Sequence, residues 1–281
     1  MQIAHEVVEG KTDLTLDEVK QLIGQTSDHF SELPNVVETP KASIYYIGDL
    51  HGEYKSAKAI ADMVIHKKKY HFVLLGDYGD RGPAQIETVN LVLALATKFP
   101  ERVTVLRGNH ESEEIAKRYG FWMDVSRKYT DSLFYDYVKV FSRMPLAGMS
   151  VNGIFSCHGG IPEEIETLKQ LNDIDRFHPN FPDDIAFQLV WNDPVDLHIA
   201  FRANKRSSRA REFGRKAFDE FCNNLDVKLM FRAHEAYNEG YQTYFDGRLV
   251  SVFSTSYRDK VTPKIARVSR EREYEIQAVP I

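Results

Sequence analysis

Three stretches of this chain join an apolar, strand-like run to a polar turn bounded by glycine, and this repetition limits the fold more than any other feature. Residues 42–47 lead into Gly48-Asp49-Leu50-His51-Gly52, residues 71–75 into Gly76-Asp77-Tyr78-Gly79-Asp80-Arg81-Gly82, and residues 102–106 into Arg107-Gly108-Asn109-His110-Glu111. Between these runs, apolar residues recur at helical spacing. Strands that alternate with helices of this length predict β-α-β units and a parallel sheet. Ligands collect beyond the carboxyl ends of such strands, where all three turns lie.

The chain divides into an N-terminal extension, residues 1–41, and one larger domain, residues 42–281. In the extension, Thr15 and Glu18 fit a capping box that starts a short helix running to about Ile23. A polar connector with prolines follows this helix. We therefore expect helical and irregular structure in the extension, without any motif that carries chemistry.

The second half of the chain has a different pattern. Residues 112–144 show mostly helical spacing, whereas residues 198–211 form a basic stretch of low hydrophobicity in which we expect a loop. Short strand-like runs follow near the end, and Asp246-Gly247 between two of them is a hairpin signal. We therefore expect a β meander beside the β-α-β half.

Composition excludes several classes of protein. The 281 residues are 43% hydrophobic and 27% charged, which is ordinary for a globular protein with a sizeable core. A formal net charge of -5 gives no basic surplus, so no nucleic-acid partner is expected. No apolar run approaches the roughly 18 residues of a membrane span, and the residues after Met1 do not fit a secretory signal. Because Cys157 and Cys222 suggest no disulfide framework, we expect a cytoplasmic protein without a membrane partner.

Six residues at the ends of strand-like runs form a candidate set of metal ligands. They are Asp49, His51, Asp77, Asn109, His158 and His234. Mixed nitrogen and oxygen donors suit manganese, iron or zinc. Six ligands are too many for one tetrahedral zinc, but they fit two divalent ions that share one carboxylate. Two ions ~3.5–4 Å apart hold the attacking and leaving oxygens of a phosphoryl displacement, with a bridging hydroxide as the nucleophile.

Three further residues complete such a site. His110 follows Asn109, and we predict that it acts as general acid for the leaving alkoxide while Asp80 holds its imidazolium. Arg81, in the same turn as Asp80, offers a planar fork for phosphate oxygens. Any one of these residues could be an ordinary turn, core or surface residue. Their joint occurrence at strand ends favours a dimetal site for phosphoryl transfer.

In this order, the motifs resemble the signature of the phosphoprotein phosphatase (PPP) family, the metal-dependent Ser/Thr protein phosphatases of the calcineurin-like metallophosphoesterase superfamily. The resemblance extends over residues 44–257 and includes Trp191-Asn192-Asp193-Pro194 and Phe213-Gly214. It implies an α/β fold with a central β-sandwich flanked by helices and a dimetal site at the strand ends. Residues 42–281 would then be a metallophosphatase catalytic domain that hydrolyses phosphate monoesters on phosphorylated proteins, using a metal-bridging hydroxide.

Carried over position by position, the resemblance also implies roles for individual residues. The first metal is bound by Asp49, His51 and Asp77, and the second by Asp77, Asn109, His158 and His234. Two divalent ions are implied, manganese in vitro, with iron or zinc as alternatives. His110 and Asp80 form the acid pair, and Arg81 binds phosphate.

Two substrate-binding positions depart from the family pattern. The family's Ser-Ala-Pro-Asn-Tyr loop is reduced to a short match that ends at Tyr257, which we expect to keep the aromatic role. A second phosphate-binding arginine is implied within residues 204–214, which do not align without a gap. We prefer Arg209, because Ala210 follows it where the family usually has glycine, and keep Arg206 as the alternative.

Other functions stay open at this point. A dinucleoside polyphosphate hydrolase or a phosphotyrosine-active phosphatase would use the same dimetal chemistry, although Glu111 after Asn109 and His110 favours the protein phosphatase branch. A binding module that has lost catalysis is a third reading, and the intact ligand set with His110 and Asp80 argues against it.

Overall fold

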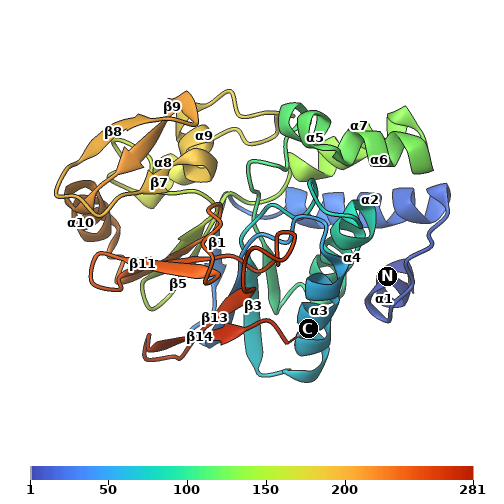
Figure 1. Ribbon diagram of the computed structural model, residues 1–281, viewed down its shortest axis with the longest axis horizontal. Coiled ribbons are helices and arrows are strands. Elements are labelled where there is room, and N and C mark those ends of the chain that lie inside the picture. The colour runs from blue at the N-terminus through green and yellow to red at the C-terminus, as the bar shows by residue number, and fades with distance from the viewer. Residues whose placement is uncertain (1, 281) are drawn as a thin grey trace.

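Two β-sheets packed face to face form the centre of the molecule (Figure 1). The computed structural model describes residues 2–280. The six-stranded sheet has the order β1 (Val36–Thr39), β5 (Ala147–Ser150), β6 (Ile154–Cys157), β10 (Leu229–Arg232), β12 (Leu249–Val252), β11 (Tyr241–Tyr244). The five-stranded sheet has the order β14 (Tyr274–Ala278), β13 (Lys264–Val268), β2 (Ser43–Ile47), β3 (Tyr70–Leu74), β4 (Val103–Val105).

Apolar side chains from the two facing sheets fill the space between them. Tyr46 of β2 stacks on Phe231 of β10 with their ring centroids 4.2 Å apart. Val73, Val250 and Ala266 are buried in the same interior. Burying one large apolar side chain contributes about 1.5–3 kcal/mol relative to leaving it exposed. This interior therefore holds the early and late parts of the chain in a fixed relation.

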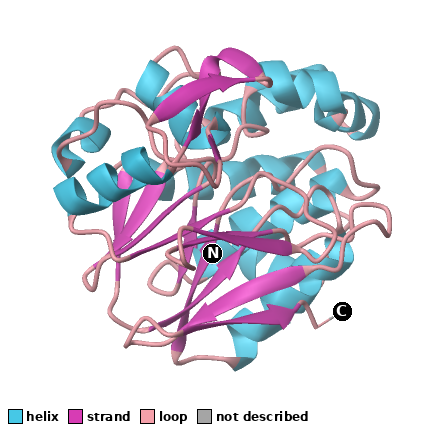
Figure 2. Cartoon of the chain, turned by 60° about the vertical axis from the view of Figure 1, so that its left-hand side comes forward, coloured by secondary structure: helices cyan, strands magenta, loops and turns pink. Residues whose placement is uncertain are grey.

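Helices cover both outer faces of the sandwich (Figure 2). The five-stranded sheet is covered by α3 (Tyr54–His66) and α4 (Gln85–Lys98), and beyond them lie α1 (Gln2–Val8), α2 (Leu16–Ser31), α5 (Glu113–Tyr119), α6 (Phe121–Lys128) and α7 (Asp131–Phe141). The six-stranded sheet is covered by α8 (Leu168–Asn172), α9 (Asp184–Trp191) and α10 (Arg215–Leu225). The predicted α/β fold, a sandwich flanked by helices, is confirmed. Across residues 2–280, no helix has the length and apolar character needed to cross a membrane.

The N-terminal segment contributes two helices to the layer over the five-stranded sheet and one strand to the six-stranded sheet. The capping box predicted for its helix is present, but α2 continues to Ser31 instead of ending near Ile23. Gly24 does not stop the helix, because Thr26 and Phe30 extend its buried face. Both α1 and α2 pack against α4, and β1 pairs in parallel with β5. The division of the chain at residue 41 stays a prediction.

The expected β meander in the last part of the chain is wrong. The Asp246-Gly247 hairpin does join β11 to β12 in antiparallel pairing, but β12 lies parallel to β10. β13 and β14 belong to the other sheet, where β13 pairs with β2. A meander requires each strand to pair with its neighbour in sequence. Here the apolar faces of β12 and β13 fill the sandwich interior from opposite sheets.

The basic stretch expected to be a loop is also different in the structure. It forms an antiparallel hairpin of β8 (Phe201–Asn204) and β9 (Ser207–Phe213), with β7 (Asp193–Pro194) parallel to β9. β9 buries Ala210 and Phe213 completely, and its pairing with β7 on one side and β8 on the other makes it the central strand of this small sheet. The hairpin therefore presents a two-residue turn, Lys205 and Arg206, at its tip.

Parallel pairing brings several strand ends to one rim of the sandwich. β2, β3 and β4 are parallel neighbours in one sheet, as predicted from the β-α-β pattern. In the other sheet β6 and β10 are parallel neighbours. A bridge between Asp49 and Phe253, just past β2 and β12, joins the two sheets at this rim.

Candidate metal centre

The turns that follow five strands meet at the rim of the sandwich. Asp49 and His51 follow β2, Asp77 follows β3, Asn109 and His110 follow β4, His158 follows β6, and His234 follows β10. All of these residues are at most 8% exposed. The structure thus brings the six predicted metal ligands and the predicted general acid to one place.

Two glycines allow the turns to approach one another closely. Gly76 has a φ of +112°, and a Cβ added there would lie 2.6 Å from the Cα of Gly108. A Cβ on Gly108 would lie 2.3 Å from Oδ1 of Asp77. A larger residue at either position would push the Asp77 carboxylate away from the Asn109 turn. The glycines are therefore required by the packing of the ligand-bearing turns.

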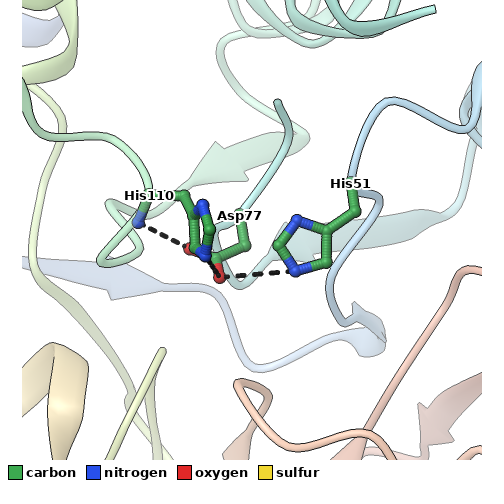
Figure 3. Close-up of side chains that lie close together, drawn as sticks. All are labelled: His51, Asp77 and His110. Atoms are coloured by element: carbon green, nitrogen blue, oxygen red, sulfur yellow. Dashed lines mark hydrogen bonds and ion pairs between the residues drawn. The ribbon is translucent and has the colours of Figure 1, made fainter. Parts of the chain in front are cut away.

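Asp77 lies between two groups of histidine nitrogens. Its Oδ2 atom is 3.8 Å from Nε2 of His51, and its Oδ1 atom is 3.3 Å from Nε2 of His158. Figure 3 shows Asp77 with His51 on one side and His110 on the other. In the triads His51–Asp77–His110 and Asp77–His158–His234, one potential ligand atom per residue lies within 4.8 Å of the others. A carboxylate in this position can be shared by two cations.

The atoms that face one another in this group include several bare acceptors. His158 donates its Nδ1 hydrogen to the Leu75 carbonyl at 2.9 Å, so its Nε2 presents a lone pair. That Nε2 lies 2.9 Å from Oδ1 of Asn109 and 3.2 Å from Nδ1 of His234. Oδ2 of Asp49 is buried and has no hydrogen-bond partner among residues 2–280. Because lone pairs this close repel unless a positive ion lies among them, the residues present fit divalent metal ions.

Burial and neighbouring charges shift the pKa values of the ligand groups. Burial raises the pKa of the Asp77 carboxyl, but His158 and His110 in their protonated forms outweigh it and hold that pKa well below its usual value. Burial lowers the pKa of His234 well below its usual value. Burial also lowers the pKa of His51, but Asp49 reverses this and makes the net direction upward. Ionised carboxylate and neutral imidazole are the forms that bind a metal. A cation bound beside Asp49 would lower the pKa of His51 and so favour its neutral form.

His110 and Asp80 form a buried pair beside the ligands. Nδ1 of His110 lies 2.5 Å from Oδ2 of Asp80. Oδ1 of Asp80 accepts the backbone N–H of Phe121 at 3.0 Å, which fixes the carboxylate. Nε2 of His110 is then turned towards the ligands, 3.8 Å from Oδ2 of Asp77. An imidazole held in this way can give a proton from Nε2 to a leaving oxygen.

Arg81 is held between two aromatic residues at the mouth of the site. Its Nη1 donates to the Tyr257 hydroxyl at 2.7 Å, and its guanidinium carbon lies 4.5 Å from the centre of the Tyr119 ring. Its Nη2 lies 3.4 Å from Nε2 of His110. The structure therefore brings the predicted Arg81 and Tyr257 together. Tyr119 was missed in the sequence, where a helical aromatic gave no signal distinct from core packing.

These side chains surround a cavity of about 470 Å³. We call this cavity the catalytic pocket. Its lining includes Asp49, Asp77, Arg81, His110, Arg206 and His234. Arg206 reaches the pocket from the tip of the β8–β9 hairpin, and its Nε donates to Oδ2 of Asp193 at 2.8 Å. The pocket is therefore basic on two sides, with carboxylate and imidazole groups at its base.

Arg209, the arginine preferred from the sequence, points elsewhere. Its Nε donates to Oδ1 of Asp184 at 2.7 Å, and its two Nη atoms donate to backbone carbonyls at 2.9 and 3.0 Å. It is not one of the described residues that line the catalytic pocket. Arg211, two positions along the same strand, pairs with another carboxylate at 3.0 Å. The geometry therefore favours Arg206, because the hairpin turn faces the pocket and strand β9 does not.

Two buried carboxylates outside the predicted site hold its parts together. Glu111 accepts hydrogen bonds of 2.8–2.9 Å from three backbone N–H groups in the turns after β3 and β4. Burial and the Asp77 charge raise the pKa of Glu111 to about 7. Asp193 accepts from Arg206 and, at 2.9 Å, from the fully buried Arg232. The sequence signal for Asp193 is its place in the Trp191-Asn192-Asp193-Pro194 motif, from which no role for this carboxylate was predicted.

Known proteins share both the sequence pattern and the fold. Residues 42–238 match the sequence model of the calcineurin-like phosphoesterase family. The serine/threonine-protein phosphatase PP2A-like PPG1 of Candida albicans is 35% identical over 239 residues, which are 84% of this chain and 57% of that protein. The serine/threonine-protein phosphatase 4 catalytic subunit of Saccharomyces cerevisiae is 33% identical over 219 residues, 78% of this chain and 70% of that protein. The chain thus spans little more than half the length of the Candida relative.

A solved structure of a serine/threonine phosphatase has a similar fold. It is a protein serine/threonine phosphatase from Saccharomyces cerevisiae with similarity to human phosphatase PP5, and it superimposes with a TM-score of 0.84 at 27% sequence identity. The match covers 94% of this chain and 89% of that one. The family model covers well over half of the chain, and the matched residues, 42–238, include all the turns that meet at the rim. The chain therefore belongs to the calcineurin-like phosphoesterase family and, within it, to the phosphoprotein phosphatases.

Proposed function

We propose that this chain is a metal-dependent serine/threonine protein phosphatase that hydrolyses phosphate monoesters on phosphorylated proteins. The proposal rests on Asp77, whose two oxygens face separate histidine groups in the pocket that is also lined by His110, the partner of Asp80. The names of both relatives support serine and threonine as the phosphorylated residues. Residues 42–281 are the proposed catalytic domain, with residues 1–41 as an extension packed against it.

The chain offers ligands for two divalent metal ions. We assign Asp49, His51 and Asp77 to the first ion, and Asp77, Asn109, His158 and His234 to the second. When bound, the ions activate a water for attack on phosphorus and neutralise charge on the phosphate oxygens. Manganese is the proposed ion in vitro, with iron or zinc as alternatives, because the set mixes imidazole nitrogens with carboxylate and amide oxygens.

His110 is the proposed general acid. Its Nδ1–H donates to Asp80, so the carboxylate stabilises the imidazolium form. The Nε2–H then protonates the oxygen that leaves from phosphorus. A serine or threonine alkoxide is a poor leaving group without a proton. An acid in this position therefore matters more for these substrates than for an aryl phosphate.

Arg81 and Arg206 are the proposed phosphate-binding residues. Tyr257 and Tyr119 hold Arg81, and Asp193 holds Arg206. A hydrogen bond to a charged group contributes about 1.5–3 kcal/mol, so Arg206→Ala should lower kcat/KM roughly 10- to 100-fold. Arg209→Ala is the matched control from the same hairpin, and it should leave kcat/KM unchanged. The reverse ranking would return the assignment to Arg209.

Phosphate release by the purified full chain with Mn²⁺ tests the function. The substrates are a phosphothreonine peptide, a phosphotyrosine peptide and diadenosine tetraphosphate, and the controls are EDTA and His110→Asn. Fastest release from the phosphothreonine peptide, abolished by EDTA and strongly reduced by His110→Asn, is the expected result. Preference for the dinucleotide or for phosphotyrosine would replace the proposed specificity. No release from any substrate by metal-loaded protein would favour a binding module.

We also propose a cytoplasmic location. Cys157 and Cys222 are both free and buried, and free thiols fit a reducing compartment. Imaging of the tagged full chain in cells tests this proposal, and signal confined to a secretory compartment would contradict it.

A further inference from the structure

A second cavity lies beside the catalytic pocket and shares part of its wall. Its volume is about 840 Å³. The residues that line both cavities are His51, Arg81, Arg118, Tyr119 and Tyr257. The second cavity alone is lined by Glu53, Arg258, Asp259 and Lys260, among others. We call it the basic side pocket. Because the two cavities share walls, a chain segment that leaves the catalytic pocket can continue directly into the side pocket.

Cations outnumber anions in the basic side pocket. Its wall contains four Lys or Arg residues, Arg81, Arg118, Arg258 and Lys260, against the two carboxylates of Glu53 and Asp259. Of these residues, Glu53 is already occupied, because it accepts the backbone N–H of Ser256 at 3.1 Å and two serine hydroxyls. Glu53 keeps its negative charge but is held by these neutral donors, and the wall still has two more cations than carboxylates.

Three of these cations are free to bind an anion. Arg118, Arg258 and Lys260 are exposed, and within the described part of the chain none has a carboxylate oxygen within the 4.0 Å of an ion pair. Arg118 lies at the end of α5, where it lines both cavities. Arg258 and Lys260 come from the loop that also holds Tyr257, the partner of Arg81. The free cations thus stand next to the proposed phosphate-binding arginine.

We propose that the basic side pocket binds acidic residues beside the phosphorylated residue of the substrate. This inference rests on the proposed phosphatase function and adds a substrate class, phosphopeptides with an acidic flank. An extended peptide advances roughly 3.3 Å per residue, so three residues from the catalytic pocket span about 10 Å. Opposite charge across a binding surface gives specificity and faster association, whereas like charge disfavours the wrong partner.

Synthetic phosphothreonine peptides test this selection. One has neutral flanks, one has aspartates before the phosphothreonine, one has aspartates after it, and one has lysines on both sides. A fifth has a second phosphothreonine in place of the aspartates, because a second phosphate offers the same anionic chemistry. For one of the two aspartate peptides we expect a kcat/KM about five- to ten-fold higher than that of the neutral peptide. This advantage should decrease with added salt, because salt screens exposed charge pairs.

A double variant assigns the selection to the side pocket. Arg258→Gln with Lys260→Gln should reduce the advantage of the acidic peptide to near unity. Hydrolysis of p-nitrophenyl phosphate should be unchanged, since this small substrate does not reach the side pocket. The matched control is Lys68→Gln with Lys69→Gln, which removes the same charge from the exposed α3–β3 turn and should keep the advantage. Thermal melting of both variants checks that they fold.

The outcomes separate this inference from the proposed function. If phosphopeptides are hydrolysed without preference for acidic flanks, or the preference survives in the double variant, the side-pocket inference is overturned and the phosphatase function stands. A preference for the doubly phosphorylated peptide alone overturns the acidic-residue class in favour of clustered phosphorylation. If p-nitrophenyl phosphate is hydrolysed but no phosphopeptide is, the proposed function fails and the inference fails with it.

Discussion

Arg107 offers a sharp test of how the ligand-bearing turns are stabilised. It is 0% exposed and directly precedes the turn that contains Asn109 and His110. Its Nε donates to the Glu111 carbonyl at 2.9 Å, and its Nη atoms donate at 2.9–3.3 Å to carbonyls between residues 176 and 179. One planar fork therefore ties the β4 turn to a segment far along the chain.

We predict that Arg107→Lys lowers the free energy of unfolding by about 3–5 kcal/mol. Lysine keeps the charge, but its single nitrogen cannot reach both groups of carbonyls. Each buried acceptor left without a partner costs about 1–3 kcal/mol, and at least two are left here. Lost stacking of the guanidinium on Phe181, now 4.2 Å from the ring centre, adds to the effect.

Urea unfolding followed by circular dichroism and tryptophan fluorescence measures this change. The matched control is Arg127→Lys, the same substitution at an exposed position of α6, where a change within about 0.5 kcal/mol is expected. A loss below about 1 kcal/mol for Arg107→Lys would refute the reasoning, because it would mean that water or lysine satisfies the carbonyls equally well.

Three further predictions follow from the described contacts. Asp80→Asn should lower kcat about 100-fold with little change in KM, because the His110 imidazolium loses its partner; steady-state kinetics measures both. Removing metal with EDTA should lower the melting temperature, and Mn²⁺ at 100 times its Kd should restore about 2.7 kcal/mol, with no such gain in Asp77→Asn. Burial lowers the pKa of His71 to about 4. Unfolded His71 therefore binds a proton as pH falls below about 6.5, whereas folded His71 stays neutral down to about pH 4. Between these two pH values the free energy of unfolding falls, and the loss at pH 5 is about 2 kcal/mol. His71→Gln should flatten the pH dependence of unfolding in that window, whereas the exposed His198→Gln should not.

The ends of parallel strands were readable from the sequence, because local patterns specify them. Glycine beside Asp49, Asp77 and Asn109 marks places where backbones approach closely, and parallel pairing then brings those places together. The choice between Arg206 and Arg209 was not readable in this way. Both are arginines of one basic stretch, and only the hairpin turn between β8 and β9 decides which one reaches the pocket.

Strand pairing over long distances was also beyond the sequence pattern. Short strand-like runs predicted strands in the region of β10 to β14, but such runs do not specify which partner each strand takes. The partner is chosen by how the apolar faces fill the sandwich, and that choice sends β13 to β2 in the other sheet. Similarly, α2 extends beyond its predicted end at Ile23 because it packs against α4, and local helix propensity gives no information about that contact.

The pairing of β13 with β2 has a consequence for how the chain is made. Ile265 lies opposite Ile47, two residues before Asp49. During translation, β2 and β3 emerge from the ribosome long before β13 exists. Until then β2 has a bare hydrogen-bonding edge, which is a template for aggregation. The nascent chain should therefore depend on chaperones, and a product truncated before Lys264 should be insoluble or inactive although it contains every proposed catalytic residue.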